Sequence, residues 1–207
     1  MPERSIEFCS LQYLNQWLER DKKYHNALVK GSRDEKLNLL REASVFYRVA
    51  RNLPRKYDID KSLRRLEPIL EKIDPLKASN FKENPEAEIN KISNQISAVY
   101  GGSSVLSLTT KFLWLKFKNP ILIYDSQARS ALGSKNGDLH SFYAKWRSAY
   151  SIKQDEIKST CEKLSNLSLY TVNPDLATSS YINKISSEDW FHERVFDIYL
   201  WNKGDQK

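Results

Sequence analysis

Apolar residues recur every three or four positions along most of the chain, with polar residues between them. The pattern is clearest in residues 34–53, where leucine, alanine, valine and phenylalanine side chains share one helical face. Residues 5–20 and 86–99 carry the same spacing. No internal repeat or sustained heptad accompanies it. The pattern therefore predicts an all-α protein.

Proline, glycine and polar clusters divide the rest of the chain into shorter elements. Asp60 and Asp138 are predicted helix N-caps, and Ser187 is expected to open the last helix. The further helices are expected at residues 60–73, 111–119, 125–132, 138–150, 155–167 and 187–201. Residues 74–87 contain two prolines and predict a loop, and residues 168–186, rich in Ser, Thr and Asn, predict an irregular segment.

The densest apolar run, residues 105–133, contains charged groups at only a few positions. Thr109 or Thr110 can cap a helix that holds Lys111 in its first turn, because a threonine oxygen accepts a hydrogen bond from an amide of that turn. Pro120 is expected to end this helix.

A short extended segment from Ile121 to Tyr124 is expected next. Asp125 is then the predicted N-cap of a second helix, which stops at Gly133. The two chain reversals place Lys111 and Asp125 at the starts of successive helices. The two side chains can therefore face one cleft.

Lysine and arginine outnumber aspartate and glutamate by 33 to 26, which gives a formal net charge of +7 and a pI near 9.2. This charge favours a polyanionic partner, because cations that neutralise phosphates release condensed counterions on binding. The basic clusters that can line a DNA groove, or simply form a solvated face, are Arg51/Arg55/Lys56, Arg64/Arg65, Lys116/Lys118 and Lys145/Arg147.

The two cysteines, Cys9 and Cys161, lie far apart, and the three histidines lack the spacing of metal ligands. This distribution excludes a disulfide framework and a four-cysteine iron–sulfur cluster. We therefore expect neither a metal nor another cofactor.

No apolar run approaches the roughly 20 residues that a membrane span needs, and the first residues do not resemble a signal peptide. We expect a monomeric protein with no membrane association, in the cytoplasm or, if the source is bacterial, at the nucleoid.

The succession of Thr110-Lys111, an apolar helix, Pro120 and Ile123-Tyr124-Asp125-Ser126 resembles the core of helix-hairpin-helix DNA glycosylases, in the branch similar to 8-oxoguanine DNA glycosylase. The resemblance is close over residues 105–133 and looser over the last helix. It implies one helical domain with two lobes, at about residues 1–80 and 81–207, and a DNA-binding cleft between them.

The resemblance also implies a mechanism. Lys111 would be the amine nucleophile at the sugar C1′ of a flipped nucleotide, and Asp125 would assist it electrostatically. A helix start and an apolar cleft both favour the neutral, nucleophilic form of such an amine. The Schiff base formed in this way can undergo β-elimination, which gives associated AP-lyase activity.

Further residues receive roles from the same likeness. Ser107, Thr109 and Thr110, with their backbone amides, would hold a DNA phosphate. Arg129 is either a phosphate contact or a solvated charge. Trp190 and Phe191 lie in the last helix, which family members use in the base pocket, although packing in the core is the alternative for both rings.

The expected function is excision of a damaged or modified base from double-stranded DNA, in repair or in defence against phage with modified DNA. One alternative is a non-catalytic helix-hairpin-helix DNA-binding module, because Ser107 and Thr109 stand where the family hairpin carries glycine and Gly101-Gly102 lie upstream. Another is a helical protein–protein adaptor, which would show no salt-dependent DNA affinity.

Overall fold

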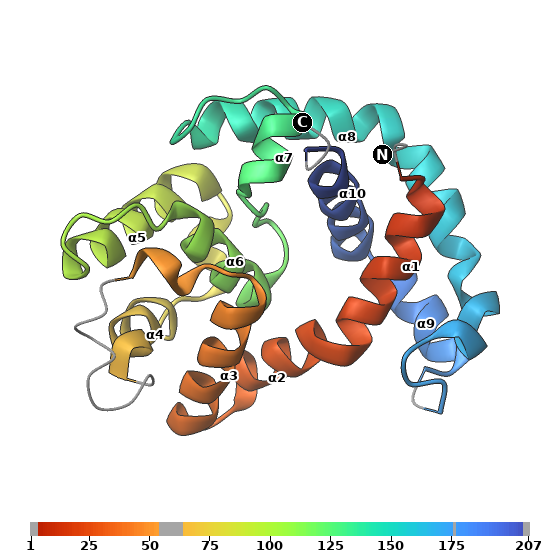
Figure 1. Cartoon of the computed structure of the whole chain (residues 1–207), viewed down its shortest axis with the longest axis horizontal. Helices are drawn as coiled ribbons and strands as arrows, with labels where there is room; N and C mark the ends of the chain where they lie inside the picture. Colours follow the sequence, from red (N-terminus) through yellow and green to blue (C-terminus); the bar gives the residue numbers. More distant parts are fainter. Residues whose placement is uncertain (1–3, 54–63, 176, 205–207) are drawn as a thin grey trace. The chain divides into compact units, whose positions relative to one another are not determined.

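The computed structural model describes residues 4–53, 64–175 and 177–204, and these residues form helices and connecting segments without a single strand (Figure 1). The all-α prediction is therefore confirmed for this part of the chain. None of the helices described combines the length and the apolar composition that a membrane crossing requires.

Two compact units make up the chain. Unit 1 comprises residues 1–22 and 125–207, and unit 2 comprises residues 23–124. These bounds differ from the expected lobes at 1–80 and 81–207. The reason is that the first helix packs against the last two long helices, so the start of the chain belongs with its C-terminal part.

Unit 2 is built mainly from four helices and the greater part of a fifth. Their bounds are α2 (Lys22–Lys30), α3 (Arg33–Phe46), α4 (Glu67–Ile73), α5 (Pro85–Val99) and α6 (Leu106–Phe117). Short 3₁₀ turns occur at Ala50–Asn52, Arg64–Leu66 and Ala78–Phe81. Helix α6 carries the most apolar face of the unit, and Phe112, Leu113 and Leu115 are completely buried.

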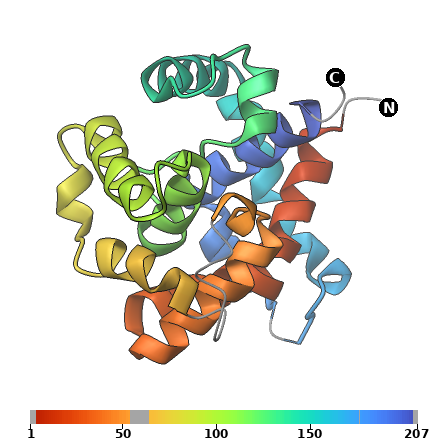
Figure 2. The same cartoon turned by 60° about the vertical axis from the view of Figure 1, so that its left-hand side comes forward.

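Unit 1 contains the remaining helices. They are α1 (Ile6–Gln16), α7 (Ser126–Ala131), α8 (Leu139–Glu162), α9 (Ser179–Ser186) and α10 (Asp189–Gly204). A π-helical turn, Trp17–Asp21, follows α1, and a 3₁₀ segment, Leu164–Tyr170, follows α8. Figures 1 and 2 both show the C-terminal turns of α10 beside the short helix α7.

Polar caps explain where several helices begin. Ser32 and Glu35 form a reciprocal capping box at the start of α3, with Glu35 Oε2 accepting from the Ser32 amide at 2.7 Å. Asn84 caps α5, and Asp138 caps α8 by accepting from the Ser141 amide at 2.9 Å. The prediction of Asp138 as an N-cap is confirmed.

Helix α3 ends earlier than the expected residue 53. Arg48 adopts a positive φ of 54°, and the Val49 amide donates to the carbonyl of Ser44 at 3.0 Å. This is a Schellman end, which is usually made by glycine. The apolar spacing of the sequence continues past Arg48, but the helix does not. The predicted cap at Asp60 lies outside the described residues.

Three further boundaries differ from expectation. Residues 139–162 form one helix instead of two, because no proline or glycine interrupts them. Residues 179–186, expected to be irregular, form α9, because the Thr178 hydroxyl caps the Tyr181 amide and Ile182 and Ile185 are buried. The last helix begins at Asp189, two residues after Ser187.

Candidate active site

Lys111 lies in the second turn of α6, and only 6% of its surface is exposed. Its Nζ lies 5.7 Å from the centroid of the Tyr47 ring, which belongs to the residue that ends α3. A lysine buried among apolar residues next to an aromatic ring is unusual, because an ammonium group loses hydration there. The structure thus places the predicted nucleophile in an enclosed, partly aromatic setting.

The predicted caps of this helix are wrong. Helix α6 begins at Leu106, and Val105, whose side chain cannot accept a hydrogen bond, occupies the N-cap. Thr109 and Thr110 lie inside the helix and are completely buried, so their side chains do not reach solvent. Lys111 is therefore one turn deeper than expected, and its environment is set by burial more than by the helix terminus.

Thr110 has a different task, which is to join α6 to the extended segment that follows it. Its hydroxyl donates toward the carbonyls of Leu106 and Ser107, at 3.1 and 3.2 Å, and accepts from the Tyr124 amide at 3.1 Å. Residues 121–124, expected to be extended, are assigned to no helix and no strand, and all four are buried.

Asp125 caps α7, as predicted. Its Oδ1 accepts from the Gln127 amide at 2.9 Å, and its side chain is partly exposed. A carboxylate held in this way keeps one orientation and one accessible face. That is the requirement for a group that stabilises a developing positive charge.

Lys111 belongs to unit 2 and Asp125 to unit 1. Within unit 2, the hydrogen bond from the Tyr124 amide to Thr110 joins the last residue of the unit to the residue before Lys111.

Helices α5 and α6 form a hairpin whose turn contains Gly101 and Gly102. Both glycines have positive φ, 71° and 83°, and a Cβ at either position would meet nothing within 4 Å. The bare backbone that a phosphate-binding hairpin needs is therefore in the turn itself, upstream of Ser107. Ser107 is partly exposed and lies in the first turn of α6. Of Ser107, Thr109 and Thr110, only Ser107 has a partly exposed side chain.

Trp190 and Phe191 pack against other aromatic rings in unit 1. The Phe191 ring is completely buried, 4.9 Å from the ring of Tyr13, and the Trp190 ring lies 4.6 Å from that of Trp17. Trp17 is in turn held by a hydrogen bond from its Nε1 to the Tyr181 hydroxyl at 2.9 Å. Both rings pack in the core, as the alternative has it, and their assignment to a base pocket stays a prediction.

Arg129 lies in the last turn of α7 and is half-buried. Its Nε is buried without a hydrogen-bond partner among the described residues. Both roles predicted for Arg129, a phosphate contact and a solvated charge, stay predictions.

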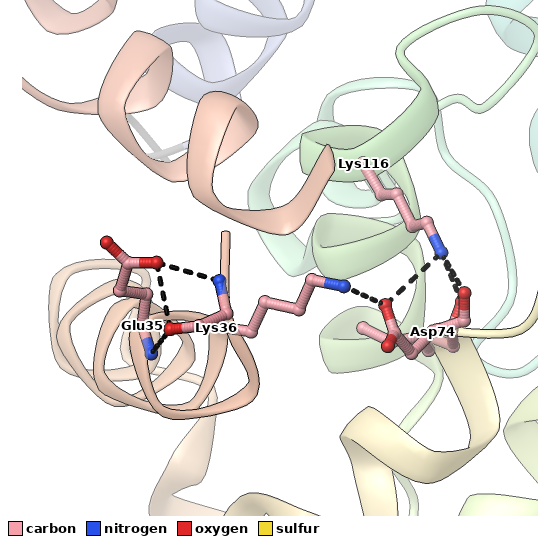
Figure 3. Close-up of polar contacts among 6 residues, drawn as sticks. Glu35, Lys36, Asp74 and Lys116 are labelled. Atoms are coloured by element: carbon pink, nitrogen blue, oxygen red, sulfur yellow. Dashed lines mark hydrogen bonds and ion pairs between the residues drawn. The ribbon is translucent and has the colours of Figure 1, made fainter. Parts of the chain in front are cut away.

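Several basic residues that were candidates for a DNA groove instead bind backbone carbonyls. Lys116 Nζ donates to the carbonyls of Ile73 and Asp74, at 2.8 and 2.5 Å, at the end of α4 (Figure 3). Lys36 reaches the Asp74 carboxylate from α3 at 2.7 Å, and burial lowers the pKa of Lys116. Lys116 is therefore a helix cap and not a surface cation.

The other basic clusters also contain residues that bind backbone carbonyls, alongside residues that do not. Arg65 donates to the carbonyls of Ala50 and Leu53, both at 2.6 Å, and Lys145 donates to that of Gly133 at 2.6 Å. Arg147 lies over the ring of Tyr143, and Arg51 is exposed. Arg55, Lys56 and the side chain of Arg64 lie outside the described residues.

The sequence prediction missed a buried charged cluster in unit 1. Asp197 accepts from the Trp146 indole at 2.8 Å, and Arg194 Nη1 lies 3.6 Å from its other carboxylate oxygen. Both charged side chains are almost completely buried. The available signal was an aspartate within the apolar run Val195-Phe196-Asp197-Ile198, since a charge in such a run must be paired.

In the parts of the chain that the structure describes, no group of three or more His, Cys, Asp or Glu side chains is arranged to hold a metal ion. Comparison with protein-family models, with curated proteins and with solved structures gave no match to this chain.

Proposed function

We propose that this chain is a DNA N-glycosylase with associated AP-lyase activity, in which Lys111 is the nucleophile and Asp125 its electrostatic partner. The substrate class is double-stranded DNA with a damaged or modified base. The proposal includes both repair and defence against DNA that carries modified bases.

The observation that carries the proposal is the enclosed amine of Lys111 on a helix that Thr110 ties to the backbone just before Asp125. A lysine that only keeps a protein soluble lies in water, whereas only 6% of the surface of Lys111 is exposed. A rigid, partly exposed carboxylate follows at the point where the chain enters α7. The open glycine turn of the α5–α6 hairpin and the net charge of +7 support a phosphate backbone as the partner.

In the proposed reaction the target nucleotide leaves the base stack, because C1′ cannot be attacked within the duplex. The nitrogen lone pair of the Lys111 amine forms a bond to C1′, and the nitrogen gives up a proton. The bond from C1′ to the base breaks, and the base leaves with the electron pair and takes up a proton. Asp125 stabilises the positive charge that develops on the sugar.

Ring opening then converts the adduct to a protonated Schiff base between Lys111 and C1′. Loss of a proton from C2′ and departure of the 3′ phosphate complete the β-elimination, which cuts the strand. Hydrolysis of the imine returns the amine. No metal or redox partner enters these steps.

Base release tests the function. Duplexes that carry 8-oxoguanine, uracil or a glucosylated hydroxymethylcytosine are incubated with the protein, and the free base is quantified. The account predicts release from at least one duplex, loss of release in Lys111→Gln, and unchanged release in Lys91→Gln, an exposed lysine of the same unit. Release that is equally fast in Lys111→Gln would contradict the assigned nucleophile.

A non-catalytic DNA-binding module is the second candidate. The buried side chains of Thr109 and Thr110 favour it, because they leave the hairpin with fewer phosphate contacts than expected. Such a module would bind duplex DNA with a steep salt dependence and release no base, and Lys111→Gln would leave its affinity unchanged.

A further inference from the structure

The C-terminal end of α3 brings aromatic and basic side chains to the enclosed Lys111 of the same unit. The Tyr47 ring, 5.7 Å from Lys111 Nζ, is partly exposed, and so is the adjacent Phe46 ring. The two rings meet edge to face, with their centroids 4.9 Å apart and their planes at 73°. Arg48 and Arg51 are exposed. We call Phe46, Tyr47, Arg48 and Arg51 the α3 rim.

Hydrogen bonds support the backbone of the α3 rim. The Arg48 carbonyl accepts from Arg51 Nε at 3.2 Å. Arg65 donates to the carbonyls of Ala50 and Leu53, both at 2.6 Å, which fixes the turn that follows. A side chain that must meet a ligand at a set angle needs this kind of support.

The left-handed position at the end of α3 is occupied by Arg48, with a φ of 54°. Glycine adopts this conformation without a steric cost, whereas an arginine does not. An arginine kept in a costly conformation indicates that its side chain has a use at that place. An exposed guanidinium beside an aromatic ring is typical of sites for unpaired nucleotides, in which the ring stacks on a base and the cation contacts the phosphate backbone.

The distance between the Tyr47 ring and the Lys111 amine fits a nucleotide that touches both. An amine attacks C1′ from about 3–3.5 Å, along the line of the bond to the base. A ring stacks on the base from about 3.5–4 Å, perpendicular to the plane of the base. Because these directions are at right angles, an amine and a ring centred over C1′ would be about 5 Å apart, and a ring centred over the base would be further away. The observed 5.7 Å agrees with this geometry.

We propose that the α3 rim receives the extruded nucleotide, with Tyr47 stacked on its base and Arg48 in contact with a phosphate of the same strand. Every base has a flat π-face, so this stacking selects an unpaired nucleotide and no particular base. The inference rests on the proposed function for the reaction at C1′, whereas binding of an unpaired base is measured without any reaction.

The first experiment separates stacking on the base from placement of the amine. At protein concentrations below the Kd, Tyr47→Leu is expected to slow base release about tenfold, within the range that one base–aromatic stack provides. Tyr47→Phe keeps the ring and is expected to release base at close to the wild-type rate. An abasic duplex offers no base to stack, so the rate of borohydride trapping on it is expected to be unchanged in Tyr47→Leu.

The second experiment needs no catalysis. Fluorescence anisotropy compares the affinity of the full chain for a labelled thymidine strand and for a labelled strand of tetrahydrofuran abasic units. Tyr47→Leu is expected to reduce the preference for the thymidine strand about tenfold. Tyr170→Leu, which removes an exposed aromatic ring of unit 1, is the matched control and is expected to leave the preference unchanged. In the wild type, photocrosslinking of a bromodeoxyuridine strand is expected to modify Tyr47, as mapped by mass spectrometry.

Arg48→Gly tests the phosphate contact with a readout that a folding defect does not imitate. The change relieves the left-handed strain, so the melting temperature is expected to stay the same or rise. Binding of the thymidine strand is nevertheless expected to weaken, and the slope of log affinity against log salt to fall by about 0.7, the value for one phosphate of a single strand. An unchanged slope would refute the contact between Arg48 and phosphate.

The outcomes separate the two claims. If Tyr47→Leu slows trapping on the abasic duplex as much as it slows base release, Tyr47 positions the amine, and the proposed stacking is wrong. If the wild type releases no base and forms no adduct, but Tyr47→Leu loses the preference for the thymidine strand, the proposed function fails and the nucleotide site stands. An unchanged preference in Tyr47→Leu, or crosslinks that all lie outside the α3 rim, would refute the site whatever the activity.

Discussion

Thr109 and Thr110 are adjacent, both completely buried and both within α6, but only Thr110 makes hydrogen bonds through its hydroxyl. The Thr109 hydroxyl has no hydrogen-bond partner anywhere in the described residues. Replacing each by valine removes one hydroxyl and keeps the shape of the side chain. The pair therefore isolates the contribution of the bond between Thr110 and the Tyr124 amide.

The expected magnitudes have opposite signs. In Thr110→Val the buried Tyr124 N–H loses its acceptor, and an unsatisfied buried donor costs about 1–3 kcal/mol, so we expect a loss of about 2 kcal/mol in the free energy of unfolding. In Thr109→Val a buried hydroxyl without a partner gives way to a methyl group. That change is expected to be neutral or stabilising by up to about 1 kcal/mol.

Urea denaturation followed by tryptophan fluorescence measures both differences, and amide hydrogen exchange at Tyr124 measures the local one. Thr110→Val should speed exchange at Tyr124 more than at amides elsewhere in unit 2, and Thr109→Val should not. Equal free energies of unfolding for the two variants would refute the assignment of Thr110 as the tie between α6 and residues 121–124.

Three further predictions concern other parts of the molecule. Lys116→Met is expected to destabilise the protein by about 2–3 kcal/mol in urea denaturation, because two carbonyls at the end of α4 lose a charged donor. Asp74→Asn should cost about 1 kcal/mol or less, because it breaks only partly exposed ion pairs. Glu193→Gln is expected to stabilise the protein by about 2 kcal/mol at pH 8 and by less at pH 5. The pKa of Glu193 in the folded protein, about 7, lies above the ordinary value, so the ionised side chain destabilises the fold at high pH. Urea denaturation at the two pH values measures the difference, and an equal gain at both would contradict it. Gly204→Ala is expected to lower the melting temperature of the protein, because the new Cβ would overlap the backbone carbonyl of Gln127, while Gly137→Ala, in open space at a positive φ, should cost only about 1 kcal/mol.

Helix caps and helix boundaries that depend on neighbouring residues were predicted from the sequence. Asp125 and Asp138 were identified as caps because an aspartate before a helical pattern has one favourable use, and both make the expected hydrogen bond. The α5 helix and the break between helices at residues 121–124 were also predicted, because apolar spacing and a nearby proline define them. The all-α class follows from the same spacing.

The errors share a physical cause, which is that tertiary contacts decide between two locally acceptable choices. Thr109 and Thr110 are good caps, but the apolar residues from Leu106 onward gain more by extending α6 backward, and Thr110 is then used by Tyr124. Arg48 ends α3 in a conformation that sequence patterns assign to glycine. Lys116 cannot be told from a surface cation until the end of α4 is seen to lie within its reach.

At the candidate site, Lys111 is buried and Asp125 caps α7, as its place before a helical pattern predicts, and the catalytic roles of both residues stay predictions. The family likeness assigns Trp190 and Phe191 to a base pocket, and in the structure their rings pack against Trp17 of the π-helical turn and Tyr13 of α1. Asp197 was missed although its place in an apolar run was a local signal, because its partner Trp146 lies on another helix, and the packing of that helix is not specified by a local pattern.

The central claim is that Lys111 is the amine that bonds to C1′, and borohydride trapping tests it most directly. The protein is incubated with duplexes carrying an abasic site or a modified base, the imine is reduced, and the adduct is digested and mapped by mass spectrometry. The account predicts a covalent protein–DNA adduct whose modified residue is Lys111, and no adduct in Lys111→Gln. An adduct at another lysine, or one that persists in Lys111→Gln, would contradict it.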